Sequence, residues 1–109
     1  MAHVTVHDRF ARMHMRVGVI LWPIDPWPVT REQWRTAEEL GFDNAWVYDH
    51  VAWRGITPWH DGYATLAAAA VETSRIRIGT LVTSPNFRHP LTAATAAKTI
   101  DDLQDLARE

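Results

Sequence analysis

Three apolar runs alternate with three segments of helical periodicity along the chain. The runs at 16–21, 44–48 and 76–82 are almost continuously hydrophobic, which is typical of parallel strands covered on both faces. The segments that follow each run repeat their apolar residues at the three- and four-residue spacing of a helix. The pattern therefore predicts an α/β fold: a parallel β-α-β-α-β-α segment with right-handed crossovers.

Local signals indicate where the predicted helices begin and end. Thr30 and Gln33 form a capping-box pattern at the start of the first helix, and Gly41 is placed to end it. Asp61 is the expected cap of the second helix, which we predict at 62–72. Pro90 suits the first turn of the third helix, because a residue there needs no intrahelical N–H bond. An apolar stripe is expected along that helix: Leu91, Ala94, Ala97, Ile100, Leu103 and Leu106.

The connections between the predicted elements are unequal. Those from helix to strand are short, whereas those from strand to helix are long and carry most of the prolines and histidines. They also hold four tryptophans that core packing explains poorly: Trp22, Trp27, Trp53 and Trp59. In parallel α/β folds function lies outside the carboxyl ends of the strands, so we expect a functional face there. Residues 1–14 show no sustained periodicity, and we expect a flexible leader at 1–14 and one domain of three βα units at 15–109.

Composition narrows the classes of function. The formal net charge of −2 gives no basic footprint for nucleic acid or an anionic membrane. The absence of cysteine excludes a disulfide framework, a thiolate metal site and a cysteine nucleophile. No apolar run approaches the roughly 20 residues that span a bilayer, and the first residues lack the apolar region of a signal peptide. We therefore expect a cytoplasmic protein.

The candidate chemistry begins at Asp49 and His50, which directly follow the second apolar run. An imidazole is the better acid or base, because its ordinary pKa lies near the operating pH, whereas the carboxylate could orient a ligand or the imidazole. Alternatively, the pair is only a polar turn. With His60, Asp61 and His89 the pair could also form a metal cluster of a barrel hydrolase. That alternative is disfavoured, because metal-binding pairs such as His-x-His are missing and Asp61 and His89 suit a helix cap and a turn.

Two motifs in series resemble a known family. The sequences A-E-E-L-G-F-D-N-A-W-V-Y-D-H at 37–50 and R-I-R-I-G-T-L-V-T-S-P-N-F-R-H-P at 75–90 are similar to the N-terminal part of the bacterial luciferase-like monooxygenase superfamily. The likeness covers roughly residues 15–103. It is closest to the branch that uses the deazaflavin coenzyme F-420, with the FMN branch second. The resemblance implies that the segment is the first third of a TIM (β/α)8 barrel, with the active site over the carboxyl ends of the strands.

The same resemblance implies roles for individual residues. By position, Asp49 would contact the coenzyme and His50 would be the acid/base partner near the reacting carbon. The family's non-proline cis peptide, which backs the flavin ring, aligns with Leu81-Val82, and Ser84 would sit near the coenzyme. The family's active-site tryptophan falls one position away from Trp53, which we take as the candidate.

Three hypotheses follow. The first is an oxidoreductase or monooxygenase that acts with a reduced flavin or deazaflavin, by hydride transfer or oxygen activation. The second is a non-catalytic remnant, because three strands would expose unpaired edges and an apolar face that a partner chain or a second copy would have to cover. The third is a fragment of a metal-dependent barrel hydrolase. No glycine-rich phosphate loop is present, so coenzyme phosphate would be held elsewhere.

Overall fold

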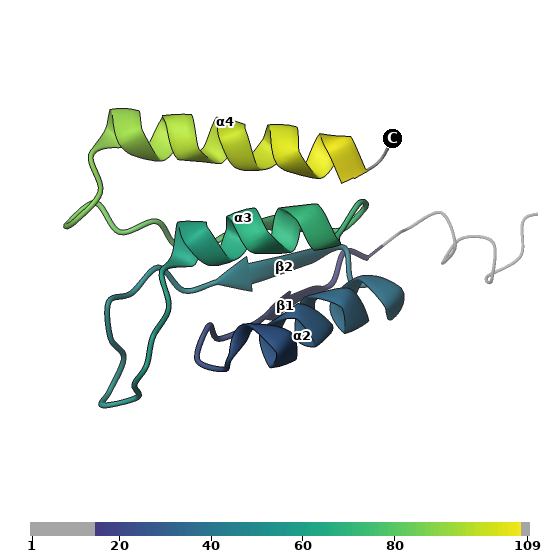
Figure 1. Ribbon diagram of the computed structural model, residues 1–109, viewed down its shortest axis with the longest axis horizontal. Coiled ribbons are helices and arrows are strands. Elements are labelled where there is room, and N and C mark those ends of the chain that lie inside the picture. Colours follow the sequence, from purple (N-terminus) through teal and green to yellow (C-terminus); the bar gives the residue numbers. More distant parts are fainter. Residues whose placement is uncertain (1–14, 108–109) are drawn as a thin grey trace, which may run out of the picture.

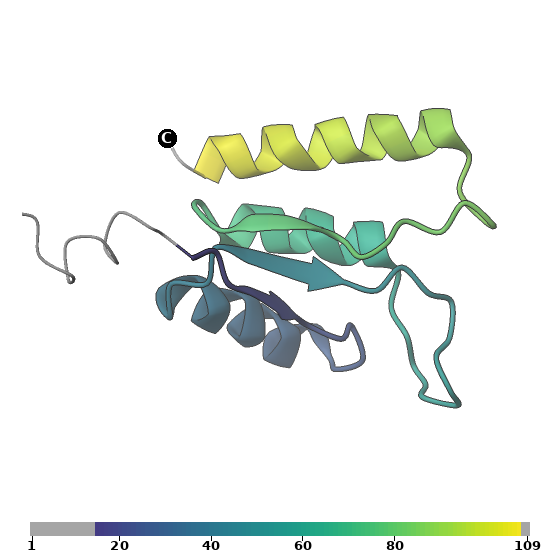
Figure 2. The same ribbon diagram turned by 180° about the vertical axis from the view of Figure 1, so that it is seen from behind.

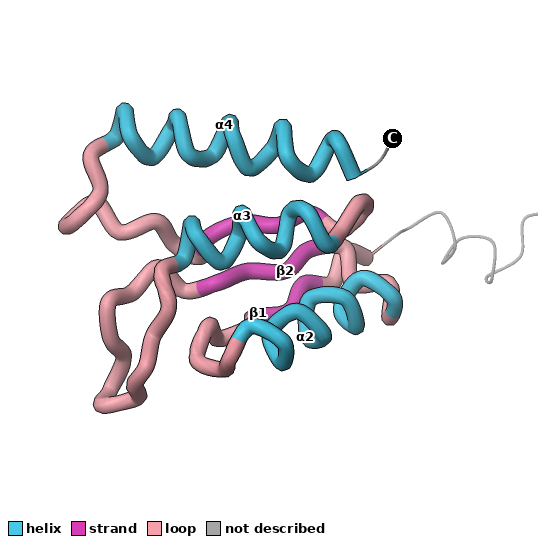
Figure 3. The backbone as a smooth tube through the Cα atoms, in the orientation of Figure 1, coloured by secondary structure: helices cyan, strands magenta, loops and turns pink. Residues whose placement is uncertain are grey.

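The structure is a computed structural model that describes residues 15–107, so the predicted leader lies outside the described residues. The strands form one parallel sheet in the order β1-β2-β3, which confirms the predicted β-α-β-α-β-α segment (Figure 1 and Figure 3). The elements are β1 (Gly18–Ile20), α2 (Trp27–Glu39), β2 (Asn44–Val47), α3 (Gly62–Glu72), β3 (Arg77–Thr80) and α4 (Pro90–Ala107). The strands are shorter than predicted, although the Leu21 and Leu81 amides extend the pairing by one residue.

The start of α2 corrects one prediction. The helix begins at Trp27, three residues before the predicted start, with Pro28 in its first turn, where a proline is tolerated. Thr30 is therefore inside the helix and is not its cap. Its hydroxyl donates to the Asp25 carbonyl at 3.2 Å, and the Gln33 amide donates to the Asp25 carboxylate at 3.1 Å. The capping-box prediction was wrong because both side chains bind the loop before the helix instead.

The two faces of the sheet differ in their cover. Ala45 and Val47 of β2 are fully buried beneath the helices, and Trp46 between them points to the opposite face. Figure 2 shows the strands from this second side, which no helix covers within residues 15–107. Ile20 is accordingly 39% exposed. The core on the covered side also contains Trp34, Ala37, Leu66, Ala69, Ala70, Ile76 and Ile100.

On the uncovered face, the indole of Trp46 lies across both neighbouring strands. A Cβ atom on Gly18 of β1 would come within 3.0 Å of the indole nitrogen and closer still to the Asn44 side chain. On β3, a Cβ atom on Gly79 would lie 2.9 Å from the far edge of the same indole. The ring is held in place by a hydrogen bond from its N–H to Asn44 Oδ1 at 2.6 Å. Gly79 thus makes room for the indole, and Gly18 makes room for both the indole and the Asn44 side chain that holds it.

Glu38 ties the end of α2 to the start of β3. Its carboxylate accepts hydrogen bonds from three consecutive backbone amides, those of Ser74 at 3.0 Å, Arg75 at 2.8 Å and Ile76 at 2.9 Å. The Arg75 guanidinium in turn donates to the Glu38 carbonyl at 2.9 Å. Burial alone would raise the pKa of Glu38, but the three amide hydrogen bonds outweigh it and lower the pKa below its ordinary value.

The helix α4 packs against α3 along only part of the predicted stripe. Ile100 is buried and Leu103 is half-buried, but the other four residues of the predicted stripe are exposed: Leu91, Ala94, Ala97 and Leu106. Gln104 is the buried contact that the stripe omitted, and its amide donates to the Ile76 carbonyl at 2.7 Å and to the Thr73 hydroxyl at 3.0 Å. The helix is therefore anchored to the start of β3 by a polar side chain.

Candidate active site

The candidate site lies at the carboxyl ends of the three strands. The loops that follow β2 and β3 leave the sheet at the same end, where α3 also begins (Figure 1). Asp49 and His50, the predicted pair, lie in the first of these loops. Their side chains do not share a hydrogen bond. Asp49 turns toward α3 and the loop after β3, whereas His50 joins a group of aromatic rings.

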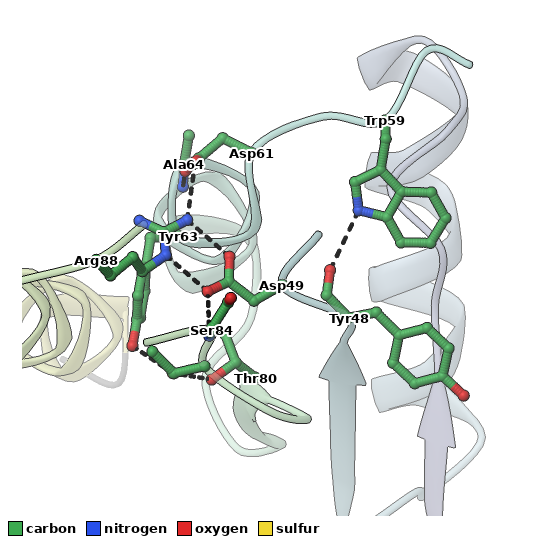
Figure 4. A network of polar contacts seen from close by, with 10 residues as sticks. Tyr48, Asp49, Trp59, Asp61, Tyr63, Ala64, Thr80, Ser84 and Arg88 are labelled. Carbon is green, nitrogen blue, oxygen red and sulfur yellow. Dashed lines mark hydrogen bonds and ion pairs between the residues drawn. The ribbon is translucent and has the colours of Figure 1, made fainter. Parts of the chain in front are cut away.

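The Asp49 carboxylate is fully buried and bound on both oxygens. Arg88 donates to it twice, from Nε to Oδ2 and from Nη2 to Oδ1, both at 2.7 Å. The Ser84 amide donates to Oδ2 at 2.9 Å. Arg88 also reaches Oδ1 of Asp61 at 2.8 Å, and Asp61 accepts from the Ala64 amide with its other oxygen, which confirms its predicted role as the cap of α3 (Figure 4).

These contacts decide the charges at the site. Burial by itself would raise the pKa of Asp49, but the hydrogen bonds from Arg88 and the Ser84 amide, with the positive charge of Arg88, hold the pKa below its ordinary value. The hydrogen bond with Asp49 likewise raises the pKa of Arg88. Asp49 and Arg88 therefore form an ionised pair at neutral pH, and two-point contact of this kind fixes the orientation of both groups.

Aromatic and hydroxyl contacts hold the loop that carries Arg88. Its guanidinium carbon lies 4.3 Å from the centre of the Tyr63 ring and 5.4 Å from that of Phe87, both within range of a cation–π contact. The Tyr63 hydroxyl is hydrogen-bonded to that of Thr83 at 2.6 Å, and Thr83 is also bonded to the Thr80 hydroxyl (Figure 4). The segment from the end of β3 to Arg88 is thus tied to α3 at several points.

His50 lies in an aromatic cluster formed by Trp22, Tyr48, His50, Trp53 and Trp59. Its ring is stacked on that of Trp53, with centroids 4.7 Å apart and planes 6° from parallel, and lies 5.6 Å from Trp59. The Trp59 indole donates to the Tyr48 carbonyl at 3.2 Å, which holds the loop after β2 against the strand (Figure 4). Two of the four loop tryptophans singled out in the sequence, Trp53 and Trp59, therefore contact His50, and Trp22 joins the cluster through Tyr48 and Trp59.

A tight turn presents Trp53 to His50. The backbone of Trp53 pairs with Ile56, whose amide donates to the Trp53 carbonyl at 2.7 Å. Arg54 and Gly55 between them both have positive φ, 45° and 74°, as in the two-residue turns of hairpins. The loop predicted to be irregular thus contains a small hairpin.

The remaining predicted residues follow β3. The peptide bond Leu81-Val82 is cis, as the family resemblance implied, and the two side chains are 42% and 68% exposed. Ser84 places its amide on Asp49, and within residues 15–107 its hydroxyl makes no hydrogen bond. The predicted contacts of Asp49, Ser84 and Trp53 with a coenzyme stay predictions.

The five residues of the metal alternative do not come together. The Asp61 and Asp49 carboxylates bind Arg88, and His89 accepts a hydrogen bond from the Leu91 amide at the start of α4. His60 is exposed and lines a cleft between α2 and α3. Within residues 15–107, the one group of three or more potential metal ligands within reach of each other consists of exposed residues on α4: Asp101, Asp102 and Asp105. The arrangement does not support a metal-dependent hydrolase.

Sequence reasoning missed Arg88. It stands within the second motif, yet nothing in its spacing indicated that it would bind Asp49, which lies 39 residues earlier. One signal was available: a buried carboxylate needs a partner, and Arg88 is the one cation in the two loops nearest to Asp49 apart from Arg54, which lies over Trp53.

Comparisons with known proteins identify the family of the chain. The family model for luciferase-like monooxygenases matches residues 3–105, a match that begins inside the predicted leader. The 5,10-methylenetetrahydromethanopterin reductase of Methanolobus tindarius is 36% identical over 93 residues, covering 85% of this chain and 26% of that protein. The F420-dependent glucose-6-phosphate dehydrogenase of Amycolatopsis mediterranei is 42% identical over 74 residues, covering 63% of this chain and 22% of that protein.

A solved structure matches as well. The coenzyme F420 dependent tetrahydromethanopterin reductase from Methanopyrus kandleri, a TIM barrel, superposes with a TM-score of 0.71 and 32% identity, over 82% of this chain and 24% of that one. The chain thus spans about a quarter of the length of these relatives. Within residues 15–107, the helices lack the combination of length and apolar character needed to cross a membrane. Fold, motifs and relatives agree, and the chain belongs to the luciferase-like monooxygenase family.

Proposed function

We propose that this chain forms the part of a coenzyme F420 site that β1, β2 and β3 contribute in a luciferase-like oxidoreductase acting on a small molecule. The observation that carries the proposal is family membership together with several relatives that are F420-dependent enzymes. FMN is the alternative coenzyme, and oxygen activation, as in a monooxygenase, is the alternative reaction. The cytoplasm stays our predicted location.

The exposed groups at the carboxyl ends of β1 and β3 suit a planar ring system. Leu81 and Val82 leave apolar surface exposed directly after β3, and Trp22 is 38% exposed after β1. Apolar walls with a few placed polar groups are the usual lining of a cofactor site. The free hydroxyl of Ser84 could bind a polar edge of the ring. When bound, F420 would supply the hydride-transfer chemistry of the reaction.

His50 would handle the proton of the reaction. Its imidazole is half-buried, and within residues 15–107 neither ring nitrogen makes a hydrogen bond, so one nitrogen could hold or release a proton at a substrate atom. The stacked Trp53 ring fixes the plane of the imidazole and excludes water from one of its faces. We therefore assign acid/base catalysis to His50 and its orientation to Trp53.

Coenzyme binding is the first test. The purified chain is titrated with F420 and, separately, with FMN, while tryptophan and coenzyme fluorescence are recorded. We expect saturable binding of F420 with micromolar affinity and weaker binding of FMN. Stronger binding of FMN would move the chain to the FMN branch. Absence of binding by either coenzyme would support a non-catalytic remnant.

The role of His50 is tested in a complete barrel. Residues 15–107 replace the matching segment of the Amycolatopsis mediterranei dehydrogenase, and turnover of glucose 6-phosphate is measured. His50→Gln should lower kcat by about 10²–10⁴-fold, the usual contribution of a general acid or base. His60→Gln is the matched control, because His60 is exposed and lies outside the aromatic cluster. Equal turnover by the two variants would remove His50 from its proposed role.

We also propose that further protein covers the open side of the sheet and the flank of α2, as a partner chain or another copy would. Support comes from an apolar groove between β1 and α2 lined by Val19, Val29, Leu40 and Phe42, with Leu40 71% exposed. Exposed apolar patches of this kind mark interaction surfaces. Sedimentation of the purified chain should give a mass above that of one copy. A stable single copy at all concentrations would contradict self-association.

A further inference from the structure

We propose that Arg88 is a positioning residue, which holds residues 81–88 in place for the coenzyme by binding Asp49, and that Asp49 acts only through this loop. The identity of the coenzyme in this inference rests on the proposed function. The claim that Arg88 holds the loop can be tested without any coenzyme. It assigns a role to a residue that the motifs did not single out. It also changes the role of Asp49 from a contact with the coenzyme to a support behind it.

The first argument is the capacity of the Asp49 carboxylate. A carboxylate accepts about four hydrogen bonds, and three N–H groups of the protein already point at this one. The remaining side of Oδ1 faces Gly62, where even a Cβ atom would come within 3.0 Å of that oxygen. The side chain has no exposed surface. A coenzyme could therefore bind these oxygens only if the hydrogen bonds from Arg88 or the Ser84 amide were broken.

The second argument is the position of Arg88, which joins three parts of the fold. Its guanidinium binds Asp49 at the end of β2 and Asp61 at the start of α3, and its backbone belongs to the loop after β3. The face of Tyr63 lies against it, and the side chain is only 16% exposed (Figure 4). Partial burial between two carboxylates makes the contact stronger than a surface ion pair.

The third argument is what this anchor fixes. The Ser84 amide is bound to the same carboxylate oxygen as Arg88 Nε, so both ends of residues 84–88 are held at Asp49. Leu81 and Val82 lie just before this anchor, and Thr83 between them and Ser84 is bonded to Tyr63. The exposed apolar surface offered to the coenzyme therefore depends on a buried ion pair behind it.

The coenzyme-free experiment measures hydrogen exchange of the Ser84 amide by NMR. Arg88→Gln should speed exchange at Ser84 by about tenfold or more, because the bonds that align the carboxylate are lost. Arg88→Lys should restore part of the protection, since it keeps the charge. Arg35→Gln is the control, because Arg35 pairs with Glu32 and Glu72 and makes no ion pair with Asp49 or Asp61. Unchanged exchange at Ser84 in folded Arg88→Gln would overturn the proposal.

A pH titration adds a signature that a loss of packing would not give. In the wild type the Ser84 amide shift should follow the protonation of Asp49 with a midpoint below that of an ordinary aspartate. Arg88→Gln should raise this midpoint, because burial then acts without the compensating cation. An unmoved midpoint would mean that Arg88 does not set the state of Asp49.

The effect on coenzyme binding is measured by titrating the same variants with F420. Asp61→Asn is included as a mild change that removes one bond to Arg88 but leaves a side chain able to cap α3. We expect affinity to fall in the order wild type, Asp61→Asn, Arg88→Gln, with the last at least about tenfold weaker. If Arg88→Gln binds F420 as tightly as the wild type, the positioning role is wrong. If the wild type binds no F420, the proposed function fails. The hydrogen-exchange experiment at Ser84 then still tests whether Arg88 holds the loop.

Discussion

Replacing Glu38 with glutamine should weaken the junction between α2 and β3. The wild-type carboxylate accepts from three consecutive amides, those of residues 74–76. A glutamine keeps one acceptor oxygen but loses the charge, and its NH₂ group would face backbone N–H donors. Hydrogen bonds to charged groups contribute roughly 1.5–3 kcal/mol each, and the partial exposure of Glu38 reduces this. We expect a loss of about 1–2 kcal/mol of unfolding free energy.

The assay is thermal unfolding followed by circular dichroism across pH. For a domain of this size, 1 kcal/mol corresponds to a shift of about 4–8 °C in Tm, so Glu38→Gln should melt at least about 4 °C below the wild type at pH 7. Glu39→Gln is the matched control, since Glu39 is exposed and its side chain makes no hydrogen bond or ion pair within residues 15–107. It should melt like the wild type.

The pKa of Glu38 determines how the difference in Tm between the wild type and Glu38→Gln changes with pH. The pKa of Glu38 is lower in the folded protein than the roughly 4.3 expected when unfolded, so its stabilisation is complete above that value. It is lost as the pH falls through the lower folded-state pKa. The difference in Tm between wild type and Glu38→Gln should therefore be constant from neutral pH to about pH 5 and shrink below it. Equal Tm for the Gln variants of Glu38 and Glu39 at pH 7, or a difference that persists in acid, would refute the reasoning.

Two further predictions concern packing. Trp34→Ala should lower the free energy of unfolding, measured by urea denaturation, by about 3–5 kcal/mol, because the side chain is fully buried. Trp27→Ala should lower it much less, because Trp27 is 37% exposed. Similar urea midpoints for the two variants would contradict the described core. Gly18→Ala should lower the free energy of unfolding by about 1–3 kcal/mol, because the added Cβ would overlap the Asn44 side chain. Adding Asn44→Ala should recover part of this loss. An unchanged free energy of unfolding in Gly18→Ala would exclude the close approach.

Local signals in the sequence predicted much of the fold. The order of strands and helices followed from periodicity alone, and Asp61 was identified as a cap because capping needs only residues within one turn. The same kind of signal failed at Thr30, because Pro28 allowed the helix to begin earlier and freed Thr30 to bind the loop. Capping patterns therefore predict the start of a helix correctly where no other nearby residue can start it.

Contacts between distant residues could not be predicted in this way. Glu38 and Ser74 are 36 residues apart, and Asp49 and Arg88 are 39 apart. In each case a single carboxylate serves donors from a different element, and no spacing rule connects them. Asp49 and His50 were predicted as one candidate pair, yet the structure sends Asp49 into an ion pair and His50 into the aromatic cluster.

The Trp46 indole on the uncovered face of the sheet limits which residues its neighbouring strands can carry. Because Trp46 occupies the space above both Gly18 and Gly79, these positions on three strands behave as one unit. A chain with small residues at 44 and 46 could carry side chains at both 18 and 79, whereas a chain with asparagine and tryptophan there could carry neither. A library that randomises positions 18, 44, 46 and 79 jointly should therefore return folded proteins that single-site changes cannot reach.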